Sequence, residues 1–99
     1  MPQHDLYPSA DGRGYLLDVQ TDHLEGLETR VVVPILPIDG APRAARVLNP
    51  VIEIDGLTYV MATQYVSAVR GKELRSPIAN LAARSAEITR ALDMLFSGF

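Results

Sequence analysis

Residues 51–62 constrain the fold of this chain more than any other stretch. The runs Val51–Ile54 and Leu57–Ala62 are rich in β-branched, aromatic and other apolar residues, and only Asp55-Gly56 separates them. An Asp-Gly connection of two residues is typical of a type I′ turn, because glycine tolerates the positive φ that this turn requires. The pattern therefore predicts an antiparallel β-hairpin over residues 51–62.

Two more strands are predicted before this hairpin. In Tyr15–Gln20, apolar side chains at alternate positions are interleaved with polar ones, which indicates a strand with one apolar face. Arg30–Leu36 is β-branched and apolar and is expected to form a buried strand that ends at Pro37. Pro34 has no N–H to donate, so an edge or a bulge is expected at that position.

The remaining segments before the last third of the chain are predicted to be connections or extensions. Pro8–Gly12 is a turn cluster, and residues 22–28 are a polar connection. Residues 38–49 are expected to form a loop with a helical turn around Ala44–Arg46, and Thr63–Val69 to extend the second hairpin strand. Arg70–Glu73 is predicted to be a charged loop.

An amphipathic helix is predicted near the carboxyl terminus. Apolar residues recur there at three- and four-residue spacing, which places them on one face. They are Ile78, Leu81, Ala82, Ile88, Leu92, Leu95 and Phe96. Two helix starts remain open, one at Ser76-Pro77 and one at Ser85.

The order of four or five strands and then one helix predicts a mainly β fold. Short connections favour an antiparallel sheet. A sheet this small with one covering helix leaves apolar surface exposed, so we expect a homodimer.

Length and composition exclude several classes of protein. The 99 residues fit a single domain over 1–99, and the absence of cysteine excludes disulfides and thiolate metal sites. No signal peptide is recognisable, and the longest apolar run, Val31–Leu36, is too short to span a bilayer. We therefore expect a cytoplasmic protein that does not enter a membrane.

The net charge of −3 argues against a direct nucleic-acid binder. The charge is uneven, with six acidic residues and two arginines in residues 1–30, and five basic and three acidic residues in residues 70–99. Two interpretations stay open for the basic part: attraction of an acidic peptide or protein, or an ordinary solvated face.

Catalytic and metal-binding patterns are sparse. His4 and His23 lack neighbours at zinc-ligand spacing, so no metal or cofactor is expected. One acid–base grouping can be assembled from separate loops, and it would suit RNA cleavage through the 2′-hydroxyl. It consists of His23 with Asp22, Arg13 or Arg30, and Asp55.

The last four residues, Phe96-Ser97-Gly98-Phe99, place two aromatic rings around a Ser-Gly pair at the predicted helix end. One interpretation is structural: Gly98 adopts the left-handed conformation of a Schellman motif, and Phe99 packs on Met94. The other is that this end contacts a partner.

The chain resembles the CcdB-type toxins of bacterial toxin–antitoxin modules. Leu17–Asp22 is similar to the family's Val-Asp-Val-Gln-Ser-Asp strand, and Arg30–Ile35 to its Arg-Met-Val-Ile-Pro-Leu. Ile78–Phe99 aligns without a gap to a closing helix that ends Leu-Met-Phe-Trp-Gly-Ile. Shorter similarities lie between these blocks, at Asn49–Ile52, Met61–Gln64 and Ala68-Val69.

The resemblance implies an SH3-like antiparallel barrel with a carboxyl-terminal helix, assembled as a homodimer. It also implies a toxin without enzymatic activity. The family's dimer inserts its helix ends into the DNA gyrase A subunit and traps the cleaved complex, and a cognate antitoxin relieves the block. The same fold is shared with MazF-type endoribonucleases, so RNA cleavage by the His23 grouping is the alternative function.

By position, the family's target-contacting Trp-Gly-Ile falls on Ser97, Gly98 and Phe99. Ser97 departs from the family, because a hydroxymethyl group cannot stack on a target arginine as the tryptophan does. Three outcomes are open: Phe99 supplies the aromatic contact, the target differs, or the chain is a weak poison or none at all.

Overall fold

The computed structural model describes residues 2–41 and 45–98. Within these residues the chain forms seven strands and one α-helix, joined by short 3-10 turns. The strands are β1 (Asp5–Pro8), β2 (Tyr15–Asp18), β3 (Thr29–Pro37), β4 (Val51–Ile54), β5 (Leu57–Met61), β6 (Ser67–Arg70) and β7 (Ala79–Asn80). The helix α1 (Ser85–Ser97) follows the last strand.

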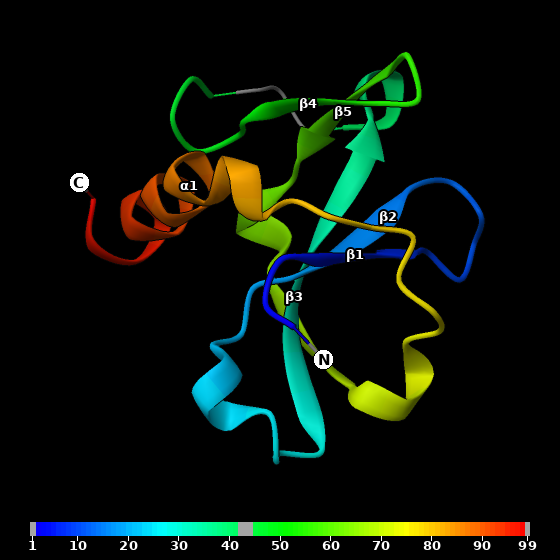
Figure 1. The fold of residues 1–99 in the computed structure, drawn as a ribbon. Coiled ribbons are helices and arrows are strands. Elements are labelled where there is room, and N and C mark those ends of the chain that lie inside the picture. Colours follow the sequence, from blue (N-terminus) through cyan, green and yellow to red (C-terminus); the bar gives the residue numbers. More distant parts are fainter. Residues whose placement is uncertain (1, 42–44, 99) are drawn as a thin grey trace.

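The strands form one antiparallel sheet organised around β3. Its order is β4-β5-β3-β2-β1-β7, and β6 pairs with β3 outside this path. The sheet curls, and α1 lies across one side of it (Figure 1). A mainly β fold with an antiparallel, barrel-like sheet and a carboxyl-terminal helix, as the sequence predicts, is therefore confirmed.

The chain changes partner strand at Pro34. On one side of β3, β6 pairs with residues up to Val32, and β5 pairs from Ile35 onward. Pro34 lies between the two, and its carbonyl accepts a hydrogen bond of 2.9 Å from the Ala62 N–H. This side of β3 is therefore locally an edge at Pro34, as its missing N–H predicts.

The 51–62 hairpin is confirmed as β4 and β5. Ile54 pairs with Leu57, and both turn residues have positive φ, 52° at Asp55 and 79° at Gly56. Two left-handed residues in succession are what a type I′ turn requires.

Two predictions about the strands were wrong, and one open alternative is decided. Thr63–Val69 does not extend the hairpin: a 3-10 turn follows β5, and β6 then pairs with β3. Of the two helix starts that the sequence left open, the one at Ser85 is confirmed, because Ile78 and Leu81 donate backbone hydrogen bonds to the strand-β1 region and leave residues 76–81 outside the helix. β1 and β7 were not predicted as strands, so seven strands replace the expected four or five.

The helical turn expected around Ala44–Arg46 falls partly outside the described residues. The Asn49 N–H donates 2.8 Å to the Ala45 carbonyl, which is one turn of α-type bonding just after that point. The Asn49 side chain fixes this turn, since Oδ1 accepts from the Ala45 N–H and Nδ2 donates to the Met61 carbonyl.

The core lies between α1 and the concave side of the sheet. Ile88 and Ala91 of the helix are 1% and 0% exposed and pack with apolar side chains from five strands. The other buried residues of this cluster are Leu6, Leu17, Val33, Ile35, Ile52, Tyr59 and Met61 of the strands and Val19, which directly follows β2.

The polar face predicted for Tyr15–Gln20 is buried. Asp18 Oδ2 accepts a hydrogen bond of 2.8 Å from Arg30 Nε and forms an ion pair of 2.8 Å with Arg30 Nη2, and both side chains are at most 1% exposed. The Asp18 Oδ1 atom also accepts from the Gln20 N–H, and Gln20 Oε1 accepts from the Val31 N–H. Burial raises the pKa of the Asp18 carboxyl, while these donors act to lower it. The pair joins β2 to β3 inside the fold.

Gly14 provides a test of the close packing of the β1–β2 turn against β3. A methyl group at this position would collide with the backbone carbonyl of Ile35. We expect Gly14→Ala to lower the free energy of unfolding by about 1–3 kcal/mol, because a backbone oxygen cannot move aside. Gly26→Ala is the matched control, since nothing lies within 4 Å of the added carbon. Chemical denaturation of both variants would show this difference, and equal stability would contradict the packing.

Candidate functional site at the end of α1

The end of α1 is capped by Gly98. Gly98 has φ 78° and ψ 16°, and its N–H donates 3.0 Å to the Met94 carbonyl. This is the single bond of an αL cap, in place of the Gly98-to-Leu95 bond of a Schellman motif. The left-handed glycine is confirmed, whereas the predicted packing of Phe99 on Met94 lies outside the described residues.

The side chains at this end turn away from the core. Phe96 is 70% exposed, the largest exposed fraction among the large apolar side chains of the described residues. Ser97 and Gly98 are exposed as well, and Leu95 is half-buried. Figure 1 shows this end of α1 at the margin of the molecule, beyond the sheet. The helix therefore presents an aromatic ring and a capped end to solvent.

The helical spacing did not predict the exposure of Phe96. The three- and four-residue spacing placed Phe96 on the buried face together with Ile88 and Leu92. The buried face ends earlier because the sheet ends: Ile88 and Ala91 have strands beneath them, and Phe96 does not belong to the core cluster. A signal for this was its place in the last turn, immediately before a serine and a glycine that bury little surface.

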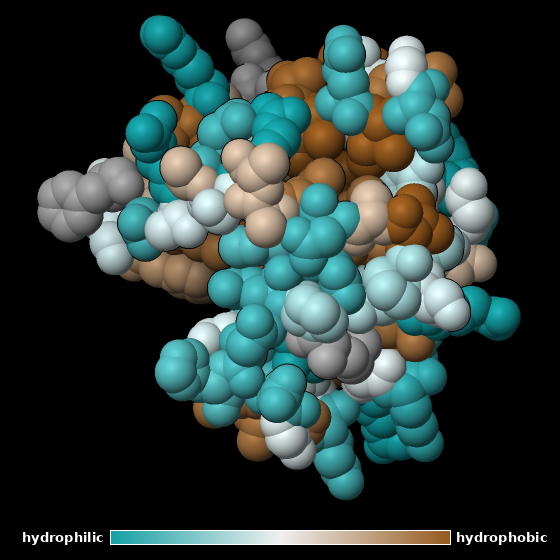
Figure 2. Space-filling model, viewed as in Figure 1, coloured by the Kyte–Doolittle hydropathy of each residue, from teal (hydrophilic) through white to brown (hydrophobic). Residues whose placement is uncertain are grey.

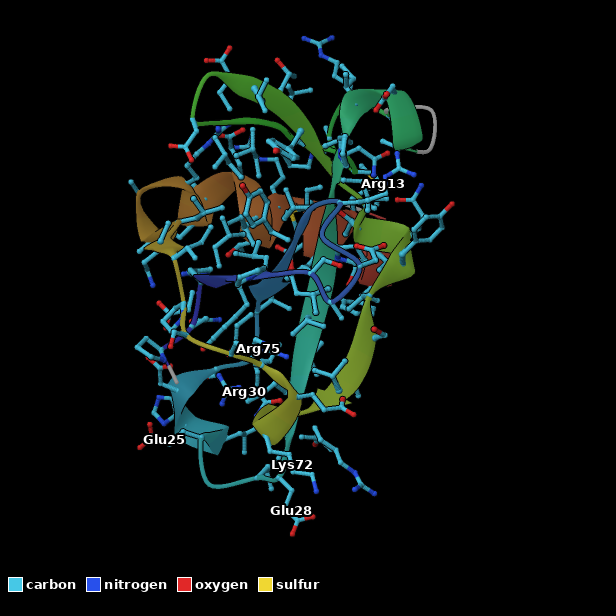
Figure 3. All side chains as sticks on the ribbon, turned by 90° about the vertical axis from the view of Figure 1, so that its right-hand side faces the viewer. Arg13, Glu25, Glu28, Arg30, Lys72 and Arg75 are labelled. Carbon is cyan, nitrogen blue, oxygen red and sulfur yellow. The ribbon has the colours of Figure 1, made fainter. Side chains whose placement is uncertain are left out.

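The acid–base grouping is not brought together. Arg30 is buried on Asp18, and the Asp55 turn lies at the opposite end of the molecule from the exposed loop that carries His23 (Figure 1). Figure 3 shows Arg13 and Arg30 at different heights along the sheet. Asp22 Oδ1 instead accepts from the Gln3 N–H. These residues therefore form no common cleft for RNA cleavage.

The part of the chain described here contains no group of three or more His, Cys, Asp or Glu side chains placed to hold a metal ion. In the same residues, no helix combines the length and apolar character needed to cross a bilayer.

A comparison with known protein families identifies the family to which this chain belongs. The family model described as CcdB protein matches residues 3–98. The chain belongs to the CcdB family. A comparison with curated proteins finds no match.

Membership of the CcdB family confirms the resemblance carried by Leu17–Asp22, Arg30–Ile35 and the closing helix. It supports the assignment of this chain as the toxin of a toxin–antitoxin module. The buried Asp18–Arg30 pair shows that two of the CcdB-like sequence blocks have a structural role, because it joins them across neighbouring strands. The exposed end of α1 has no comparable role in the core.

Proposed function

We propose that this CcdB-family protein poisons a type II topoisomerase, the DNA gyrase A subunit, by protein–protein contact through Ser97, Gly98 and Phe99, and that a cognate antitoxin neutralises it. Residues 1–99 act as one toxin domain without catalysis. The observation that carries the proposal is the solvent-exposed, Gly98-capped end of α1 in a chain that matches the family over residues 3–98.

A homodimer is part of this proposal. Large apolar side chains remain exposed on several elements, among them Val51, Leu57, Tyr65, Ile78 and Phe96. Figure 2 shows apolar atoms gathered on the upper part of one face, where the β4–β5 hairpin lies. A two-fold assembly would cover part of this surface and present two helix ends to the target.

Truncating the aromatic side chains at the helix end tests the site. We expect Phe99→Ala and Phe96→Ala to abolish growth inhibition in a host without the antitoxin. Phe96→Ala should lower the free energy of unfolding by less than about 1 kcal/mol, because the Phe96 ring is largely exposed. The readouts are colony counts after induction and denaturant midpoints.

Leu27→Ala is the matched control, because Leu27 is 52% exposed in the connection before β3 and is not one of the side chains assigned to the dimer contact. It should leave toxicity unchanged. If both Phe variants stay fully toxic, or if they lose toxicity only by unfolding, the helix end is not the contact.

A weak or absent poison is the second candidate. The observation that favours it is Ser97, which stands where the family resemblance places a target-contacting tryptophan, so the aromatic contact is lost at this position. A cation–π contact contributes about 0.5–2 kcal/mol, and a tryptophan at the centre of an interface often exceeds about 2 kcal/mol. Unchanged growth after expression without antitoxin, from a folded protein, would support this candidate.

A further inference from the structure

The chain between β6 and β7 contains a strap, residues 74–78, that has little support from the rest of the fold. Its first N–H donates 3.1 Å to the Gly71 carbonyl, and its last, that of Ile78, donates 2.8 Å to the Leu6 carbonyl. Between these two anchors, residues 75–77 make no hydrogen bond with any described part of the chain. Figure 1 shows the strap in yellow, passing along the outside of the molecule before the chain turns toward α1.

The sequence of the strap favours an extended backbone. Pro77 disfavours the helical conformation at the residue before it, which is Ser76, and fixes its own φ. Leu74 has φ −84° and ψ 126°, which is also extended. Arg75 therefore lies between residues of extended conformation, and the side chains of Arg75, Ser76 and Pro77 are all exposed.

A cavity separates the strap from the sheet. Its volume is about 540 Å³, and Leu74 and Arg75 form one wall together with Glu73. The opposite wall consists of Pro8, Ser9, Ala10, Leu16 and Val69. None of these residues belongs to the buried cluster of the core. The strap can therefore move away from the sheet at Arg75 without opening the core.

The other basic residues of the described part of the chain lie in bonded structure. Arg30, Arg70 and Arg90 belong to β3, β6 and α1, Lys72 and Arg84 to 3-10 turns, and Arg13 and Arg46 to hydrogen-bonded turns. Within residues 2–41 and 45–98, Arg75 is therefore the one basic residue with an exposed side chain in an extended segment without hydrogen bonds. Figure 3 shows Arg75 on the strap, away from Lys72 and Arg13.

We propose that the Arg75–Ser76 peptide bond is a cleavage site for an endoprotease that recognises a basic residue before the bond it cuts. Such an enzyme binds its substrate as an extended segment through backbone groups, and the strap offers both the extended shape and unbonded backbone groups. Hydrolysis adds one water across the bond, which leaves a carboxylate on Arg75 and an amino group on Ser76. The proline lies one residue further on, so it does not block the bond after Arg75.

Cleavage at this bond would divide the fold in a defined way. Residues 1–75 keep strands β1 to β6, and residues 76–99 carry β7 and α1. The smaller fragment is then held only by the pairing of β7 with β1 and by the packing of Ile88 and Ala91 in the core. Unfolding of the cut chain releases two fragments, so its stability should fall and depend on protein concentration. Cleavage would thus detach α1, whatever its target is.

The proposed homodimer has to leave Arg75 open for this cleavage. Ile78, at the end of the strap, is among the exposed apolar side chains available for the two-fold contact. Arg75 precedes Ile78 by three residues, which is about 10 Å along an extended chain. A dimer that covers Ile78 can therefore leave the Arg75–Ser76 bond accessible.

Limited digestion of the folded full chain with trypsin tests the proposal, with mass spectrometry to identify the products. Trypsin is the probe because it cuts after arginine and lysine. We expect residues 1–75 and 76–99 as the first products. The denaturant midpoint of the cut chain should be lower than that of the intact chain and should rise with protein concentration.

Two variants locate the cut, and one serves as the control. Arg75→Gln and Ser76→Pro should each slow the loss of intact chain by about tenfold or more, the first by removing the basic side chain and the second by placing proline directly after it. Arg13→Gln removes an exposed arginine from a hydrogen-bonded turn and should change the rate less than about twofold. Circular dichroism checks that all three variants fold.

Three results would overturn the proposal. One is a first cut at any other basic residue. Another is resistance of the Arg75–Ser76 bond in the folded chain under conditions that cleave the unfolded chain, whether a rigid strap or a second copy protects it. The third is equal slowing by Arg75→Gln and Arg13→Gln.

Discussion

Arg30→Met is expected to destabilise the protein by about 3–5 kcal/mol, because it leaves the Asp18 carboxylate in the interior without its cation. Both side chains are at most 1% exposed, and Nε and Nη2 of Arg30 lie 2.8 Å from Asp18 Oδ2. In a domain of this size, such a loss lowers the melting temperature by more than about 10 °C. Thermal and denaturant unfolding of the variant would measure it.

The double variant Asp18→Leu with Arg30→Met separates pairing from packing. Replacing both charged partners by apolar side chains should recover most of the lost stability, because no buried charge remains. Arg84→Gln is the surface control: it breaks the exposed Arg84–Glu87 pair and should cost less than about 1 kcal/mol. Equal losses of unfolding free energy in Arg30→Met and Arg84→Gln would show that the buried pair contributes no more to stability than the exposed pair.

Ser97→Trp is expected to increase gyrase poisoning by about 30-fold, which corresponds to roughly 2 kcal/mol of added contact. Ser97 is exposed in the last turn of α1, so a larger side chain can be placed there without entering the core. The indole would restore the aromatic face that the CcdB family presents at this position. The measurement is the protein concentration that half-inhibits supercoiling by purified gyrase.

Ser67→Trp is a suitable control, because Ser67 is also exposed and lies on β6 at the side of the sheet. It adds the same ring away from the helix end and should leave inhibition unchanged. An equal gain from both variants would indicate a non-specific effect of tryptophan. No gain from Ser97→Trp would mean that the helix end does not meet gyrase in the manner of the family.

Local patterns predicted part of this fold well. The Asp55-Gly56 turn was predictable because a two-residue connection with positive φ leaves few other conformations. Pro34 marked the break in pairing along β3 because it lacks an N–H. The helix start at Ser85 was one of two alternatives, and only the β1–β7 pairing decides between them.

Contacts between residues far apart in sequence determine the features that local patterns did not predict. Asp18 and Gln20 have the alternation of a solvent-facing strand side, and only their hydrogen bonds to Arg30 and to the Val31 N–H explain their burial. Phe96 has the spacing of a core residue, but the sheet does not extend beneath it.

The candidate site was predicted by alignment with the family and not by chemistry. Ser97, Gly98 and Phe99 carry no catalytic pattern, and the one acid–base grouping that the sequence offered is dispersed in the structure. What the structure adds is the left-handed cap at Gly98 and the exposure of the neighbouring ring.

A DNA-cleavage assay with purified gyrase, plasmid and the full chain tests whether the end of α1 poisons gyrase. We expect linear, protein-linked DNA that accumulates with the chain, increases with Ser97→Trp and disappears with Phe99→Ala in a folded protein. Absence of trapped cleavage with both the natural chain and Ser97→Trp, each shown to be folded, would contradict it.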